Sequence, residues 1–223
     1  MKWNFKRDIF ALALLGIFII IDIYFYSILP QTVPSHFNSS GLPNAYSSKL
    51  SFVLIAAGVP VALYFLATFI PFIDPLKKKF GTNFNIFFLL RDFIIGLIVF
   101  VMILALISAK ERIVRTDLIG LGIGILFILI GNYMPKLPRN FFFGIRSPWT
   151  LASDIVWHRT HRISGVLFVI GGLLMIVLSL FKVSMITSLT IVLIPLLVFT
   201  AFIYPYFLYR KLQKEGKLNN PDL

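Results

Sequence analysis

Six long apolar runs constrain the fold of this chain more than any other feature of its sequence. A bilayer core of about 30 Å is crossed by about 20 helical residues. The runs lack the strict alternation of barrel strands, and a helix satisfies its own backbone amides in lipid. We therefore predict an all-α polytopic membrane protein with six transmembrane helices, which lie at residues 9–29, 50–72, 86–108, 118–134, 163–181 and 185–208.

The fourth run is the shortest and has a distinctive composition. Small residues let membrane helices approach one another closely, so we expect this helix to pack tightly on its neighbours. The glycines that support this expectation are Gly120, Gly122, Gly124 and Gly131.

The composition excludes several classes of function. Hydrophobic residues make up 58% of the 223 positions and charged residues only 13%, about half the share in a soluble domain. The chain has no cysteine, which excludes disulfides, thiol catalysis and thiolate metal sites. Three histidines and nine acids remain for acid–base or metal chemistry. We therefore expect no enzyme activity, no cofactor and no metal.

The basic residues predict how the chain is oriented in the membrane. One set of connections, together with both termini, holds fifteen Lys and Arg, and the opposite set holds five. By the positive-inside rule, both termini and the segment 135–162 are cytoplasmic, and the loop 30–49 faces outward. The same rule explains the net charge of +12 without direct nucleic-acid binding. The basic start resembles a signal peptide, but its long apolar run favours a retained first span in a bacterial plasma membrane.

The cytoplasmic stretch from Arg139 to Gly165 concentrates polar and aromatic residues in an otherwise apolar chain. Gly144 permits a turn, and Ser147 followed by Pro148 is typical of a helix start, with serine as the N-cap. We predict an interfacial helix from Pro148 that bends or continues into the fifth span. The tryptophans Trp149 and Trp157 suit the lipid headgroup zone.

Three interpretations of this predicted helix compete. It could be an anchor, with its tryptophans in the headgroups and its arginines on lipid phosphates. It could be a recognition surface for a peptide or protein. It could also carry metal or catalytic chemistry. The spacing places four polar residues along one helix face, namely Asp154, His158, His161 and Arg162.

A longer pattern in the same stretch resembles the signature of the SdpI family, bacterial immunity proteins against a secreted sporulation-delaying peptide toxin. Ser147 stands where the pattern has threonine, and Ser164 where it has a second glycine. The residues that match are Asn140, Gly144, Ile145, Arg146, Pro148, Trp149, Thr150, Leu151, Trp157, Thr160, His161, Arg162 and Gly165.

The outer loop carries a second resemblance, to the small domain that often precedes the SdpI signature. Asn44 replaces the aspartate of that pattern. We expect His36 to form a hydrogen bond within the loop, with toxin contact as the alternative. The matching residues are Pro34, His36, Phe37, Gly41, Pro43, Tyr46 and Lys49. We predict a two-span region at 1–80, with this loop, and a four-span SdpI-like region at 81–223, with its signature segment at 135–165.

Charged residues within the spans need a separate explanation. Asp22 lies inside span one, where an unpaired ion costs about 2.5–3.5 kcal/mol. It should be neutral, paired or facing water. Arg91 and Asp92 lie near the cytoplasmic end of span three, so we expect a snorkelling arginine and no direct pair with Asp22. An internal polar site formed by these three residues is the alternative.

The resemblance implies a function that suits this layout. The chain would bind or neutralise a secreted peptide toxin at its outer loop and helices. The family is also thought to signal by holding a cytoplasmic transcriptional repressor at the membrane, and the segment from Arg139 to Arg162 would dock it. A small-molecule or peptide transporter is the alternative, supported by Asp22, although no inverted repeat is evident.

Overall fold

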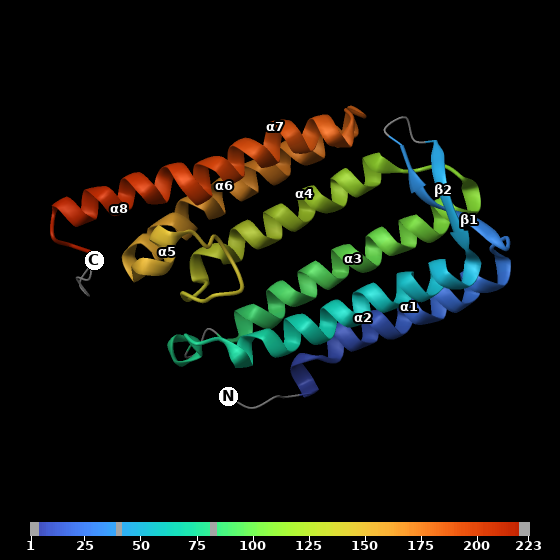
Figure 1. The fold of residues 1–223 in the computed structure, drawn as a ribbon, viewed down its shortest axis with the longest axis horizontal. Coiled ribbons are helices and arrows are strands. Elements are labelled where there is room, and N and C mark those ends of the chain that lie inside the picture. The colour runs from blue at the N-terminus through green and yellow to red at the C-terminus, as the bar shows by residue number, and fades with distance from the viewer. Residues whose placement is uncertain (1–4, 39–41, 81–83, 219–223) are drawn as a thin grey trace.

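The structure is a computed structural model that describes residues 5–38, 42–80 and 84–218 (Figure 1). Six helices in it are long and apolar enough to cross a membrane, which confirms the predicted number. The first four are α1 (Ile9–Ile28), α2 (Lys49–Ile73), α3 (Asn85–Glu111) and α4 (Thr116–Tyr133). After the short helix α5 (Pro148–Ala152), the fifth is α6 (Asp154–Leu180). The sixth combines α7 (Met185–Leu197), a π-helical turn (Val198–Ile203) and α8 (Tyr204–Lys214).

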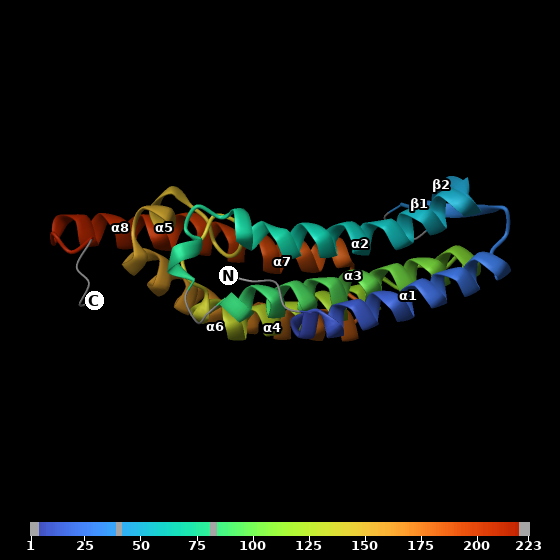
Figure 2. The same cartoon turned by 90° about the horizontal axis from the view of Figure 1, so that it is seen from below.

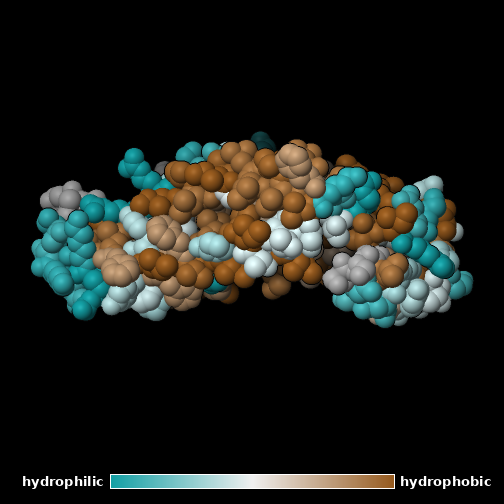
Figure 3. Space-filling model, turned by 90° about the horizontal axis from the view of Figure 1, so that it is seen from above, coloured by the Kyte–Doolittle hydropathy of each residue, from teal (hydrophilic) through white to brown (hydrophobic). Residues whose placement is uncertain are grey.

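The helices run along the long axis of an elongated bundle, and the connections gather at its two ends (Figure 1). Both termini and the segment 135–147 lie at one end, and the connection between α1 and α2 lies at the other. An apolar belt separates the hydrophilic ends (Figure 3). This arrangement agrees with the predicted separation of the loop 30–49 from the termini. The chain is a multi-pass membrane protein.

The outer loop forms a β-hairpin that the sequence analysis did not predict. Strand β1 (Thr32–Phe37) pairs antiparallel with β2 (Pro43–Ser48), and the register shifts between Pro34 and His36. Proline has no amide to donate to a ladder, so a bulge beside it is expected. The hairpin leads directly into α2, because the Ser48 side chain accepts a hydrogen bond of 3.2 Å from the amide of Ser51.

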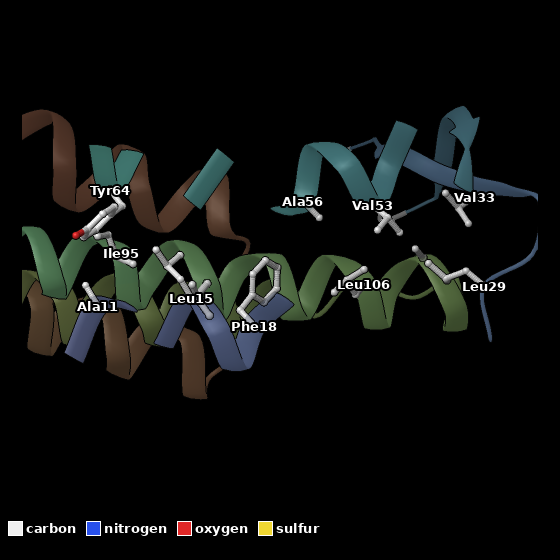
Figure 4. Packing of buried hydrophobic residues seen from close by; sticks show 12 residues of the cluster. Ala11, Leu15, Phe18, Leu29, Val33, Val53, Ala56, Tyr64, Ile95 and Leu106 are labelled. Atoms are coloured by element: carbon white, nitrogen blue, oxygen red, sulfur yellow. The ribbon is translucent and has the colours of Figure 1, made fainter. Parts of the chain in front are cut away.

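A continuous apolar core joins α1, α2 and α3 (Figure 4). Leu15 and Phe18 of α1 are buried against the same cluster as Val53 of α2 and Leu106 of α3. Val33 of the hairpin is also fully buried there. The hairpin is therefore anchored on the three-helix group.

Helices α4 and α6 pack with their backbones in close approach, which confirms the expectation for the fourth span. A Cβ atom added to Gly131 would lie 2.6 Å from the carbonyl oxygen of Gly165, and one added to Gly124 would lie 2.7 Å from that of Gly172. The two contacts run in opposite order along the two helices. An antiparallel pair thus meets through glycines, as lipid-embedded helices commonly do.

The fifth and sixth membrane helices are longer than a bilayer core. At 1.5 Å per residue, the 27 residues of α6 and the 30 residues of Met185–Lys214 span about 40 and 45 Å, against a core of about 30 Å. At the end that holds both termini, α8 and the start of α6 extend past α1, α2 and α3 (Figures 1 and 2). The C-terminal half therefore projects beyond the apolar belt at this end.

Candidate functional site

The predicted helix start at Pro148 is confirmed, and its capping chemistry is local. Thr150 Oγ1 accepts a hydrogen bond of 2.8 Å from the Ser147 amide, and Ser147 Oγ accepts one of 3.3 Å from the Thr150 amide. This reciprocal pair is a capping box. Thr150 Oγ1 also donates to the Ile145 carbonyl at 2.8 Å. The helix stops at Ala152, Ser153 is extended, and α6 begins at Asp154, so the helix bends before the fifth span as expected.

His161 connects the segment before Pro148 to α6. Its Nδ1 lies 2.8 Å from the Trp157 carbonyl, and its Nε2 lies 3.0 Å from the Ile145 amide. A carbonyl can only accept and an amide can only donate, so these partners assign a neutral ring protonated on Nδ1. Gly144 has a φ of +93°, and a Cβ there would lie 2.4 Å from Nε2. Glycine is therefore required both for the backbone turn and for the approach of the ring.

The expectation that Trp157 anchors the chain in lipid headgroups is wrong. This side chain is completely buried, its Nε1 donates to the Leu137 carbonyl at 2.8 Å, and its ring stacks on His161 at 4.0 Å between centroids. The indole belongs to an apolar cluster that includes Leu137 and Phe143 of the preceding loop and Phe87 of α3. Trp149 is partly exposed and packs edge-on against Tyr206, with centroids 5.3 Å apart.

The remaining signature residues hold the loop 139–146 in shape. Asn140 is fully buried, and its Oδ1 accepts from the amides of Phe142 and Phe143 at 2.9 and 2.6 Å. Arg146 is exposed, but its Nη1 donates to the Phe141 carbonyl at 2.6 Å. The Phe141 amide in turn donates to Asp74 Oδ2 at 2.8 Å, which ties the loop to the end of α2.

The four polar residues predicted to share one helix face do not form one site. Asp154 pairs with Arg139 at 2.8 Å, whereas His161 is buried with both ring nitrogens engaged. His158 and Arg162 are exposed. A single face built from all four is therefore wrong, because Gly144 and its neighbours cover His161. Among the residues that the structure describes, no group of three or more His, Cys, Asp or Glu could hold a metal ion.

In the outer hairpin, His36 forms the hydrogen bond expected within the loop. Its Nδ1 lies 2.5 Å from Oδ1 of Asn44 on the opposite strand. Pro34 is buried, and Gly41 lies outside the described residues. Lys49, at the start of α2, places its Nζ 4.5 Å from the ring centroid of Tyr26.

Arg91 does not snorkel, which corrects the sequence-based expectation. It is fully buried, forms an ion pair with Asp8, and lies 2.8 Å from Asp92 Oδ1 and 2.8 Å from Thr68 Oγ1. The guanidinium also lies over the rings of Tyr64 and Phe88, at 5.1 and 5.0 Å. These partners come from the start of α1, from α2 and from α3. We call Arg91, Asp8, Asp92 and Thr68 the Arg91 cluster.

Asp22 does not belong to the Arg91 cluster, so the alternative of a polar site formed by Asp22, Arg91 and Asp92 is wrong. Its side chain is buried, and its Oδ1 makes no hydrogen bond with any described residue. The absence of a direct pair between Asp22 and Arg91 was expected from their different depths.

Two separate parts of the chain match known protein families. Residues 136–209 match the SdpI/YfhL protein family, and residues 13–59 match a domain of unknown function (DUF1648). The immunity protein SdpI of Bacillus subtilis (strain 168) is 29% identical over 208 residues, which is 93% of this chain and 98% of that protein. The chain is thus similar to the SdpI family in its C-terminal part, and to one immunity protein over nearly its whole length. No solved structure matches the chain.

The SdpI-family match covers the capped helix start, the His161 contacts and the glycine contact at Gly165 described above. The Arg91 cluster lies outside both matched ranges. Sequence reasoning missed Asp8, because an acid between Arg7 and the first apolar run resembles an ordinary flanking charge. Thr68 carried no signal at all, since a single threonine in a membrane helix commonly bonds to its own backbone.

Proposed function

We propose that this chain is an SdpI-family membrane immunity protein that binds or neutralises a secreted antimicrobial peptide toxin. The observation that carries the proposal is the similarity to a protein named as an immunity protein, which extends over 93% of this chain. Such a function needs no chemical conversion, and the proposed role is non-enzymatic. The regions at 1–80 and 81–223 would act together, since α3 packs against both α1 and α4.

The β-hairpin is the part of the molecule that meets a peptide arriving from outside. The positive-inside rule places it on the outer face. Leu42 and Tyr46 are exposed there, with 62% and 56% of their surface accessible. Because Val33 is buried in the core of α1, α2 and α3, a contact on the hairpin is transmitted directly to these helices.

The cytoplasmic end offers a docking surface for a partner such as a transcriptional repressor. The exposed basic residues at the start of α6 are Arg159 and Arg162. Helix α8 packs beside them through Leu212, and it carries Arg210, Lys211 and Lys214. This surface projects beyond the apolar belt and favours an acidic partner or anionic lipid headgroups.

Survival of a toxin-sensitive bacterium that expresses the chain tests the immunity function. Cells that carry the protein in their membrane should survive a toxin dose that kills cells carrying the empty vector. Equal killing at confirmed membrane levels of the protein would refute the proposal.

Charge reversal separates docking from folding. Arg162→Glu should leave protection and membrane level unchanged but release a fluorescently tagged repressor from the membrane. Trp157→Ala should lower the membrane level itself, because Trp157 is a core residue. If Arg162→Glu retained the repressor as the wild type does, docking on this surface would be excluded.

A further inference from the structure

A long apolar groove runs between α1, α3 and α4. Its volume is about 730 Å³, and thirteen residues line it. Phe10 contributes from α1, Phe93 and Leu97 from α3, and Ile125 from α4. Asp92 is the one charged residue in this lining. From Leu118 to Leu129 along α4, the groove covers twelve residues, whose eleven rises correspond to about 16 Å or three helical turns.

Gly96 on α3 lines the groove and leaves unfilled space beside its Cα atom. A Cβ atom added there would have no described heavy atom within 4 Å. At Gly122, on the α4 wall, an added Cβ would instead lie 2.9 Å from a side-chain carbon of Leu97. Small residues at a lipid-facing surface allow another helix to approach closely. Gly96 therefore marks a position where a helix can pack against α3 without displacing any side chain.

Asp92 gives the groove a negative end. Both contacts that Arg91 makes with it use Oδ1, through Nε at 2.9 Å and Nη2 at 2.8 Å. No hydrogen bond of the second oxygen, Oδ2, is found among the described residues. Arg91 also neutralises Asp8, so the Arg91 cluster contains two acids and one base. A basic group placed beside Oδ2 would donate to an acceptor that no described residue uses.

Space is available for such a group. A smaller hollow of about 370 Å³ adjoins the groove and shares Leu89 and Asp92 with it. Arg7 also lines this hollow, and its guanidinium lies 5.9 Å from the ring centroid of Phe84 and 5.8 Å from that of Phe88. The flexible stem of a lysine can reach Asp92 from the groove and keep its ammonium in this polar region.

We propose that the groove binds one apolar helical segment of the peptide toxin, packed on Gly96, with a basic group of the peptide paired to Asp92. This inference rests on the proposed immunity function and assigns its ligand site. Apolar side chains spaced along one helix face would fill the groove, as in other helix-in-groove complexes. An acyl chain has no donor to pair with Asp92 Oδ2, so it explains the groove less well.

A synthetic probe represents this class of ligand. It is a helix of about 20 leucines and alanines, long enough to cross the bilayer, with one lysine four residues from its end and a fluorophore. Binding is measured by energy transfer to the labelled full-length protein in phosphatidylcholine vesicles. A second probe has glutamine in place of the lysine.

Gly96→Leu fills the groove, and Gly58→Leu is its matched control. Gly58 lies in α2, and an added Cβ there also meets nothing within 4 Å, so both variants should fold. We expect Gly96→Leu to weaken binding of the lysine probe at least tenfold and Gly58→Leu to leave it unchanged. We also expect Asp92→Asn to weaken the lysine probe to the level of the glutamine probe, while the wild type prefers lysine.

The outcomes separate this inference from the proposed function. Equal binding by Gly96→Leu and Gly58→Leu, no preference for lysine, or no binding by the wild type would overturn the groove as the peptide site. Loss of a co-purified phospholipid from Gly96→Leu without a change in probe binding would assign the groove to lipid instead and also overturn it. If the wild-type chain protects cells and Gly96→Leu protects them equally, the inference fails and immunity stands. If the wild type gives no protection, immunity itself fails.

Discussion

Replacing His161 by leucine tests whether this residue is structural or a ligand-binding group. The variant removes the acceptor for the buried Ile145 amide, at 3.0 Å, and the donor to the Trp157 carbonyl, at 2.8 Å. An unsatisfied buried donor costs about 1–3 kcal/mol, and the lost ring stacking on Trp157 costs about 0.5–1.5 kcal/mol. We expect His161→Leu to lower the free energy of unfolding by about 3 kcal/mol.

The matched variants identify which atom matters. A glutamine side chain at this position would present an oxygen near the place of Nε2, so His161→Gln should recover about half of the loss. His158→Leu, at an exposed position on the same helix, should change stability by less than about 0.5 kcal/mol. Unfolding of the purified protein in mixed micelles, followed by tryptophan fluorescence, measures all three. Equal stability of His161→Leu and His158→Leu would refute the structural role.

Three further predictions concern Gly144, Asp8 and Ser164. Gly144→Ala should lower stability by more than about 1 kcal/mol, because φ is +93° and the new Cβ would collide with His161; a thermal melt unchanged from wild type would contradict this. Asp8→Asn should lower the free energy of unfolding by about 3 kcal/mol, because it breaks one of the buried ion pairs of Arg91. A loss below about 0.5 kcal/mol in a denaturant titration would exclude that pairing. Ser164→Ala should raise stability by about 1 kcal/mol, because Ser164 Oγ is buried without a partner among the described residues; a lower melting temperature would reveal a bond that is absent from the structure.

The sequence predicted those features that depend on neighbouring residues. The six membrane helices follow from the length of the apolar runs, and all begin and end close to the expected positions except for the start of the fifth and the end of the sixth. The start at Pro148 follows from the capping preference of Ser147 and the fixed φ of proline. The close packing of α4 follows from its glycines.

Features that depend on distant segments were not predictable in this way. The ion pair between Arg91 and Asp8 joins residues 83 positions apart, and hydropathy contains no information about such a partner. Tryptophan is a residue type typical of headgroup anchors. Trp157 is nevertheless completely buried, with its Nε1 bonded to Leu137 of the loop before α5. The hairpin was missed because its strands are short and interrupted by prolines, which weakens any alternating pattern.

The π-helical turn at Val198–Ile203 has a consequence for the direction in which the last helix presents its charge. Pro205 has no amide to offer to the preceding turn, and the wider turn leaves space for its ring. Because each α-helical residue rotates the chain by about 100°, one additional residue here rotates everything that follows by about that angle. An evolutionary deletion of a single residue in this turn would therefore swing Arg210, Lys211 and Lys214 toward a different side of the molecule, with no change in the basic residues themselves.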